Sequence, residues 1–325
     1  MILAITFAAS GTERAISAQA VGDVADIRYL TDLDQSGRSE ILSRADVLLA
    51  RNTAKELRAD ELALVRNARL IQFLSAGLDY LPLNDLPAGV PIGKNAGAYA
   101  EPMAEHALAM ALAAGKRLVM EHQNLTRGEF NQFTPNKMLR GRICGIFGFG
   151  GIGAATARLM RCVGMRIHAI NRRGTAEEQV DWIGTPNRLD ELLAAADVLI
   201  ISAPLTRATQ GVIGRRELSL MKEDAIMINL ARGEIVDEDA LYEHLNAKSR
   251  FTACLDAWWI EPVRHGEFRI KHAFLQLPNV IGSPHNSASV TDAYEVALRH
   301  ALANCRRALL GQTPLHLLRP EERMR

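Results

Sequence analysis

Short apolar runs alternate with segments of helical periodicity along the first hundred residues. This alternation of short, apolar, strand-like segments with amphipathic segments predicts a parallel sheet covered by helices. The predicted strands are Ile2–Phe7, Ile27–Leu30, Val47–Ala50, Leu70–Leu74 and Val90–Gly93.

A second series of apolar runs begins near residue 144. From Val198 onward these runs are continuously apolar rather than alternating, which is typical of strands buried on both faces of a parallel sheet. The predicted strands are Cys144–Phe147, Met165–Ile170, Val198–Ser202, Ala225–Asn229, Thr252–Asp256 and Val280–Gly282.

Two longer helices are predicted outside these alternating units. Residues 102–115 are rich in Ala, Leu and Met, with Pro102 near the start, where its missing N–H does no harm. This helix joins the two series of strands. A last helix follows Val290, shows a 3.6-residue apolar period and ends before Gly311.

A glycine-rich turn follows the first strand of the second series and precedes a helical segment. Gly148 allows a sharp turn, Gly150 allows backbone to approach a pyrophosphate, and Gly153 allows the helix to pack on its strand. The helix N-terminus adds N–H groups and a positive dipole end. A dinucleotide is therefore expected to bind at Gly148, Phe149, Gly150, Gly151, Ile152 and Gly153.

The end of the next strand discriminates between two nicotinamide cofactors. An acidic residue there binds the ribose hydroxyls of NAD, whereas an Arg accommodates the 2′-phosphate of NADP. The chain has Asn171, Arg172 and Arg173 at this place. We expect NADP, with NAD still possible; the alternative is that both arginines only solvate a loop.

Composition and charge narrow the class of protein. The 325 residues are 48% hydrophobic, enough for two cores, and a net charge of +1 gives no indication of nucleic-acid binding. The four cysteines are scattered within apolar stretches, as buried free thiols are, and nothing indicates a metal site. No stretch is long enough to span a bilayer. We expect a cytoplasmic protein whose first residues form a strand.

Three polar residues follow strands of the second series, at the sheet edge where ligands bind in open parallel sheets. They are Arg232 in NLARGEIVDEDAL, Glu261 in LDAWWIEP and His285 in GSPHNSAS. Each has a plainer interpretation as well. Arg232 is followed by acidic residues with which it could pair, and Glu261 could be an exposed turn residue. His265 or His272 could intrude on the site, although solvation at the surface is the favoured interpretation of both.

Several motifs together resemble the D-isomer-specific 2-hydroxyacid dehydrogenases, a family that includes glyoxylate/hydroxypyruvate reductases and phosphoglycerate dehydrogenases. The similar segments, in chain order, are SAGLDYLPL, AEHALAMALA, GFGGIG, SAPLTRATQGVI and NLARGEIVDEDAL. The resemblance implies that Arg232, Glu261 and His285 are the catalytic residues. The interval from Glu261 to His285 looks longer than is usual in the family.

The chemistry of these residue types suits a 2-oxo acid. Arg232 offers a planar fork to the carboxylate and the keto oxygen. Histidine is the side-chain type whose unperturbed pKa lies near neutral pH, so a residue of this type at position 285 can donate a proton during reduction and accept one during oxidation. Glu261, if hydrogen-bonded to the imidazole, would hold one tautomer and favour its protonated form.

The resemblance implies further contacts. The backbone of Ser75, Ala76 and Gly77 is expected to bind the substrate carboxylate, together with Arg232. Asp256 is expected near the nicotinamide, and Ala203, Pro204 and Thr209 near the rest of the cofactor. The pair Trp258 and Trp259 departs from the family pattern and is either core packing or a wall of the substrate pocket. A homodimer that pairs around the helix at 102–115 and the following arm is also implied.

The sequence thus predicts an α/β protein with two doubly wound parallel-sheet domains. Residues 1–96 and 288–325 are expected to form a flavodoxin-like substrate domain, and residues 97–287 a Rossmann nucleotide-binding domain. The expected reaction is the NAD(P)H-dependent reduction of a small 2-oxo acid to its D-2-hydroxy acid, without nucleic-acid or membrane partners. The alternative is a dinucleotide-sensing, corepressor-like protein of the same fold.

Overall fold

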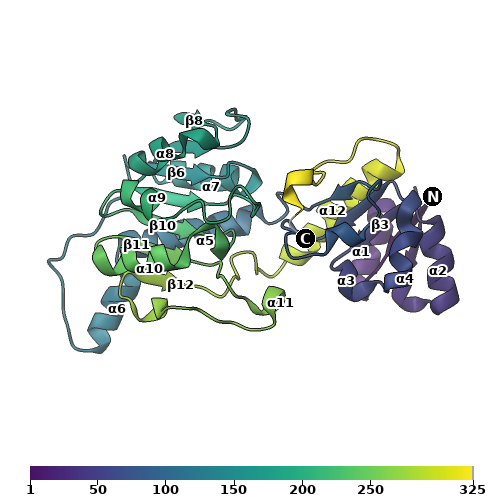
Figure 1. Ribbon diagram of the computed structural model, residues 1–325, viewed down its shortest axis with the longest axis horizontal. Helices are drawn as coiled ribbons and strands as arrows, with labels where there is room; N and C mark the ends of the chain where they lie inside the picture. Colours follow the sequence, from purple (N-terminus) through teal and green to yellow (C-terminus); the bar gives the residue numbers. More distant parts are fainter. Residues whose placement is uncertain (324–325) are drawn as a thin grey trace. The chain divides into compact units, whose positions relative to one another are not determined.

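The computed structural model describes residues 1–323, and the chain divides into two compact units (Figure 1). The first unit contains residues 1–99 together with the C-terminal part from Val290, and the second contains residues 100–289. The sequence placed these boundaries at residues 97 and 287. The assignment of substrate to the first unit and cofactor to the second stays a prediction.

The first unit is built on a five-stranded parallel sheet of order β2-β1-β3-β4-β5. This order, 2-1-3-4-5, is that of flavodoxin-like folds. The strands are β1 (Ile2–Ile5), β2 (Asp26–Tyr29), β3 (Val47–Ala50), β4 (Leu70–Phe73) and β5 (Ile92–Gly93). The helices are α1 (Gly11–Val21), α2 (Gln35–Arg44), α3 (Thr53–Glu56), α4 (Ala59–Leu62) and α12 (Ala293–Leu309).

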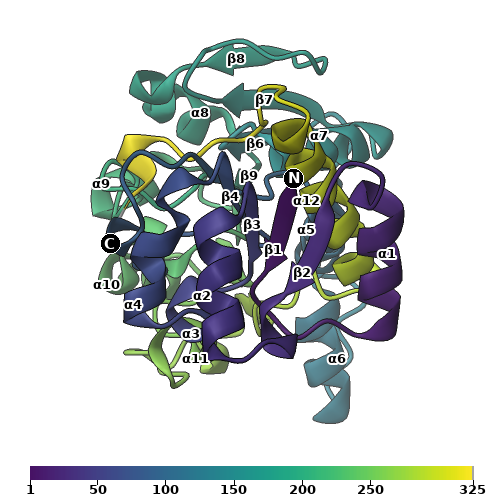
Figure 2. The same cartoon turned by 90° about the vertical axis from the view of Figure 1, so that its right-hand side faces the viewer.

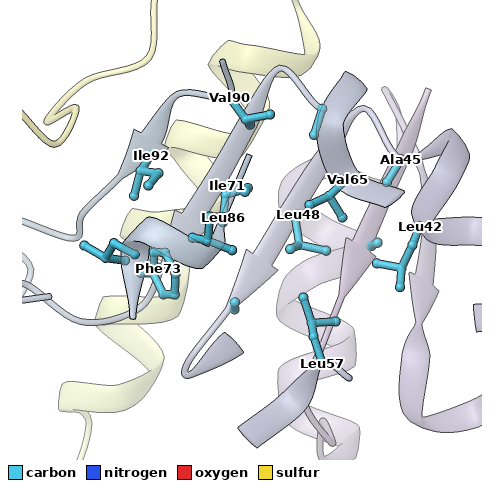
Figure 3. Packing of buried hydrophobic residues seen from close by; sticks show 14 of the residues in the cluster. Leu42, Ala45, Leu48, Leu57, Val65, Ile71, Phe73, Leu86, Val90 and Ile92 are labelled. Atoms are coloured by element: carbon cyan, nitrogen blue, oxygen red, sulfur yellow. The ribbon is translucent and has the colours of Figure 1, made fainter. Parts of the chain in front are cut away.

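Alternate residues of these strands face opposite sides of the sheet, as the period of two requires. On one side, Leu3, Val47 and Leu70 pack against α1 and α12. On the other side, Leu48 and Ile71 pack with Leu42 of α2 and neighbouring loop residues (Figure 3). Figure 2 shows α1 and α12 on one side of this sheet and α2 on the other. Burial on both faces explains the continuous apolar character of β3.

The second unit contains a seven-stranded parallel sheet of order β12-β11-β10-β9-β6-β7-β8. Six strands match predicted runs: β6 (Ile143–Phe147), β7 (Arg166–Ile170), β9 (Val198–Ile201), β10 (Ile226–Asn229), β11 (Thr252–Leu255) and β12 (Val280–Gly282). The seventh, β8 (Trp182–Gly184), was not predicted. Trp182 and Ile183 of this edge strand are only partly buried, and most of the residues before it are polar, so no apolar run marks it.

Helices cover this second sheet. The long predicted helix is α5 (Ala100–Gly115), which begins two residues before the expected start. Ala100 and Ala104 of α5 pack on Ala155 of α7, so small side chains permit a close approach of the two helices. The helices after α5 are α6 (Leu118–Thr126), α7 (Gly151–Cys162), α8 (Leu189–Ala195), α9 (Arg215–Leu220), α10 (Glu238–Ala247) and α11 (Pro262–His265).

The fold class predicted from the sequence is confirmed, since both units are parallel-sheet α/β folds. Among residues 1–323, no helix combines the length and apolarity that crossing a membrane requires. One detail of the sequence interpretation is wrong: three of the cysteines are buried, but Cys162 is exposed because it lies in the last turn of α7, on the side facing solvent.

Candidate active site

The glycine-rich turn between β6 and α7 has the geometry of a phosphate-binding loop. Gly148 has a φ of +105°, and a Cβ there would lie 2.2 Å from the backbone nitrogen of Ala203. A Cβ at Gly153 would lie 2.8 Å from the carbonyl oxygen of Gly148. A Cβ at Gly150, by contrast, would meet no atom within 4 Å. The open space over Gly150 is therefore suited to a pyrophosphate, to which the N-terminus of α7 would present its N–H groups.

Asn171 organises the turn that follows β7. Its side-chain oxygen accepts hydrogen bonds from the backbone N–H groups of Arg173 and Gly174, at 3.0 and 2.8 Å, and its amide donates to the carbonyl of Thr175. The turn presents Arg172 and Arg173 at the surface, where both residues are exposed. Asn171 thus shapes the loop that carries two cations and adds no negative charge to it.

The segment after β9 packs beside the glycine turn. Ser202 donates a hydrogen bond to the carbonyl of Gly148, and buried Ala203 occupies the space that a side chain at Gly148 would need. Thr209 donates from its hydroxyl to the carbonyl of Pro204 and closes this segment into a compact turn. The structure therefore brings two predicted cofactor segments side by side at the carboxyl ends of β6 and β9.

His285 and Glu261 form an ion-pair geometry. Nδ1 of His285 lies 2.8 and 2.9 Å from the two carboxylate oxygens of Glu261, so Nδ1 carries a hydrogen and donates it. Glu261 is 5% exposed and is the N-cap residue of α11, which excludes the exposed-turn interpretation. The side chain of His285 is 34% exposed. Because Nδ1 is engaged, Nε2 is the nitrogen that can exchange a proton with a ligand.

Positive charge dominates the environment of the Glu261 carboxylate. Burial alone would raise the pKa of Glu261. The hydrogen bond and charge of His285, the backbone N–H of Trp258 and the charge of Arg232 outweigh burial, so the pKa lies below its ordinary value of 4.5. The backbone next to Arg232 lies against the segment that carries Glu261, since a Cβ at Gly233 would lie 2.3 Å from the carbonyl carbon of Trp258. The structure thus brings the three predicted catalytic residues into one neighbourhood.

The backbone around Arg232 is fixed by β10 and the residues that follow it. Asn229, at the end of β10, donates from its side chain to the carbonyl of Arg232 and accepts from the N–H of Ala231. The guanidinium of Arg232 donates to the carbonyl of Ala231 at 2.8 Å. The acidic residue two positions later, Glu234, pairs with Arg264.

A buried carboxylate holds the turn that carries His285. Asp256 is fully buried, and its oxygens accept hydrogen bonds from the hydroxyl of Ser283 and from the N–H groups of Asn286 and Ser287. The hydroxyl of Ser283 in turn accepts from Nε2 of His106, on α5. These bonds hold His285 with a φ of +51°, a left-handed conformation that is rare outside glycine. The predicted contact of Asp256 with the nicotinamide stays a prediction.

The two tryptophans are part of the core. Trp258 and Trp259 are 3% and 9% exposed, and their indole N–H groups donate to the carbonyls of Ser283 and Val236. The rings pack edge-on against Phe268 and stacked on Phe274, respectively. Core packing is therefore the role that the geometry supports for both.

The two alternative histidines occupy different places. His272 pairs with Asp239 and stacks on Tyr242, so it belongs to the surface of α10. His265 accepts the backbone N–H of Glu261 on its Nδ1 at 3.0 Å. It therefore caps the strand-to-helix junction that carries Glu261, a role that the sequence did not suggest.

The predicted substrate loop lies in the first unit, directly after β4. The carbonyl of Ser75 accepts the N–H of Asn95, and its hydroxyl lies 3.1 Å from that of Tyr80. These contacts fix the start of the Ser75-Ala76-Gly77 turn. Its role in binding a carboxylate stays a prediction.

Within residues 1–323, side chains of His, Cys, Asp and Glu form no group of three that could hold a metal ion. The polar groups that converge are instead a cationic fork and an imidazole backed by a carboxylate. Such a set can bind an anion and can add a proton to, or remove one from, the same molecule. Sequence reasoning missed Ser283, His106 and Arg264 because their partners lie far away along the chain.

Comparisons with known proteins agree with this geometry. Residues 108–287 match the model of the NAD-binding domain of D-isomer specific 2-hydroxyacid dehydrogenases. Hydroxypyruvate reductase from Thermotoga maritima is 30% identical over 263 residues, covering 80% of this chain and 84% of that protein. Glyoxylate reductase from Aeropyrum pernix is 30% identical over 274 residues, covering 81% and 79%. A D-isomer specific 2-hydroxyacid dehydrogenase family protein from Aeromonas salmonicida has the same fold, with a TM-score of 0.78 at 23% identity and 98% coverage of both chains.

The family model matches more than half of the chain, and the reductase from Thermotoga maritima aligns along most of both proteins. The resemblance expected from the motifs is therefore confirmed. The chain belongs to the D-isomer specific 2-hydroxyacid dehydrogenase family, and its second unit carries the nicotinamide-dinucleotide-binding domain of that family.

Proposed function

We propose that this protein uses NADPH to reduce a small 2-oxo acid, such as glyoxylate or hydroxypyruvate, to the D-2-hydroxy acid. The observation that carries the proposal is the hydrogen-bonded pair of His285 and Glu261, with Arg232 within electrostatic reach. Relatives named hydroxypyruvate reductase and glyoxylate reductase support the choice of substrate.

Each residue has a defined task in this proposal. Arg232 binds the substrate carboxylate and the keto oxygen through its planar fork. His285, protonated and held by Glu261, donates the Nε2 proton to the oxygen as negative charge develops there. Preorganised positive charge of this kind stabilises a developing oxyanion by several kcal/mol, and about 3 kcal/mol corresponds to roughly a hundredfold in rate.

The cofactor supplies the hydride when it is bound. The space over Gly150 and the N-terminus of α7 would hold the pyrophosphate. Asn171, Arg172 and Arg173 would take the adenosine end, where two cations and no carboxylate favour a 2′-phosphate. The proposed preference is therefore NADPH over NADH. The packing of Ala203 against Gly148 supports a shared cofactor surface formed by both segments.

A substrate panel tests this proposal directly. Purified protein is mixed with NADPH or NADH and with glyoxylate, hydroxypyruvate, pyruvate and phenylpyruvate, and cofactor oxidation is followed at 340 nm. We expect turnover with the two small acids and higher kcat/KM with NADPH. Cofactor binding without oxidation by any acid would instead favour the dinucleotide-sensing alternative.

We further propose that the protein works as a homodimer that pairs around α5 and the arm that follows it, which consists of α6 and residues 127–142. This stretch of the second unit exposes several large apolar side chains, including Phe130 at 75% and Phe133 at 89%. Apolar groups gathered in this way are typical of protein–protein contact surfaces. Size-exclusion chromatography with light scattering should give twice the chain mass, and F133D should shift the protein toward monomer. A cytoplasmic location stays part of the proposal.

A further inference from the structure

Two segments carry the candidate catalytic residues, and three contacts connect them. The first segment runs from the end of β10 through Arg232 to Val236, and the second runs from the end of β11 to Glu261 and α11. A Cβ at Gly233 would lie 2.3 Å from the carbonyl carbon of Trp258, so the two backbones touch there. The indole of Trp259 donates to the carbonyl of Val236 at 2.8 Å.

The third contact is an ion pair between Glu234 and Arg264. Both guanidinium NH2 groups of Arg264 donate to the carboxylate of Glu234, at 3.0 and 2.7 Å, in a bidentate arrangement. The side chain of Arg264 is 8% exposed and that of Glu234 is 21% exposed, so the pair is largely shielded from solvent. Bidentate pairs of this type add geometric specificity as well as energy.

Each partner of this ion pair is close in sequence to a candidate catalytic residue. Glu234 lies two residues after Arg232, and Arg264 lies three residues after Glu261. Each partner is therefore rigidly connected to one catalytic residue through a short 3₁₀ helix (Gly233–Ile235) or through α11. We propose that Glu234 and Arg264 are positioning residues that set the distance between the Arg232 guanidinium and the Glu261–His285 pair.

This inference rests on the proposed function, because the positioned groups matter only if both act on one substrate. Hydride transfer depends strongly on alignment, and a displacement of about 1 Å can lower a rate by roughly a hundredfold. The pair does not itself touch the reacting atoms in this assignment. Its loss should therefore lower kcat while cofactor binding at the glycine turn persists.

The main test compares R264Q and E234Q with the wild type. We expect kcat to fall by roughly 10- to 100-fold in each, with a change in the Kd for NADPH of less than about threefold. NADPH carrying deuterium at the transferred position should give a larger isotope effect on kcat in both variants, since misalignment makes the chemical step slower. A variant that merely contains less folded protein would keep the wild-type isotope effect.

A matched control exists in the same unit. Arg216 and Asp190 form a bidentate pair at 2.7 and 2.8 Å, with side chains 63% and 51% exposed, between α9 and α8. R216Q removes a pair of the same geometry that connects no catalytic segment, so its kcat and isotope effect should match the wild type. R264K, which keeps the charge but loses the fork, should fall between R264Q and the wild type.

The outcomes separate the two proposals. Wild-type kcat and isotope effect in folded R264Q, or in R264K should R264Q fail to fold, would overturn the positioning role and leave the proposed reaction standing. Absence of turnover by the wild type would overturn the proposed reaction instead. In that case, amide hydrogen exchange still tests whether the Glu234–Arg264 pair fixes the Arg232 segment. Residues 229–236 should exchange faster in R264Q than in R216Q, and equal exchange would refute the positioning role.

Discussion

The catalytic neighbourhood and the Asn171 turn lie in the same unit but are built very differently. Glu261 is buried, shares both oxygens with His285 and receives the Trp258 N–H, whereas Arg172 and Arg173 lie exposed on a turn closed by one asparagine side chain. The groups proposed to move protons are held by buried contacts, while the groups proposed to choose between cofactors are exposed. Exchanging cofactor preference should therefore disturb the fold far less than altering the chemistry.

The largest effect is expected for H285A, which tests the pair of Glu261 and His285. Loss of the proton donor should lower kcat/KM by roughly 10²- to 10⁴-fold, because general acid catalysis contributes about that much. The Kd for NADPH, measured by fluorescence, should stay close to the wild-type value. H272Q is the matched control, since His272 pairs with Asp239 on the surface of α10, and it should retain activity. Equal rates for H285A and the wild type would remove His285 as the acid.

R232K tests whether the fork or only the charge is needed. A lysine keeps the positive charge but cannot bind carboxylate and keto oxygen bidentately. We expect kcat/KM to fall by roughly 10²- to 10³-fold, as when one preorganised donor to an oxyanion is removed. Steady-state kinetics on glyoxylate measures this change. Near-wild-type activity of R232K would show that point charge suffices.

The exposed side of the comparison is tested by the double variant R172A/R173A. A charge-assisted hydrogen bond contributes about 1.5 kcal/mol at the lower end of its range, which suits an exposed site, so the loss of two should lower the affinity for NADPH roughly 100-fold while the affinity for NADH changes little. The thermal midpoint should hardly move, because both side chains are exposed. R250A, which removes another exposed arginine of this unit, serves as control. Equal losses for the two cofactors would contradict a phosphate-binding role.

The smallest expected effect is on stability in acid. Since the pKa of Glu261 is lowered on folding, its ionised form stabilises the fold fully above pH 4.5, and this contribution is lost as the pH falls through the lower folded value. Urea unfolding between pH 3 and pH 6 should therefore show a shallower acid decline in E261Q than in the wild type. Parallel pH profiles would indicate that Glu261 is not coupled to folding.

The sequence predicted the fold well because periodicity reports burial directly. The first four residues of the predicted strand Val198–Ser202 are all apolar, and β9 (Val198–Ile201) forms there, buried on both faces. The strand β8 escaped prediction because Trp182 and Ile183 are only partly buried and follow a mostly polar stretch, so the sequence shows no apolar run there. Cys162 was misjudged because its apolar neighbours along the chain are not its neighbours in space.

The candidate site was predictable in its members but not in its supports. The three catalytic candidates follow strands, and parallel strands bring their carboxyl ends to one edge. The pairing of Glu234 with Arg264 and of Ser283 with Asp256 depends on loop geometry between residues 27 to 30 positions apart. No local pattern encodes such contacts, because side chains of these types are equally common on solvated surfaces.

The left-handed backbone at His285 lowers the stability of the folded protein at the residue proposed to transfer the proton. A non-glycine residue held there costs roughly 1 kcal/mol or more, so glycine at position 285 would relax the turn and remove the proposed proton donor. Substitutions that increase stability should therefore tend to replace His285 if turnover is not under selection. If the proposed role is right, continued selection for turnover keeps a histidine at this strained backbone position.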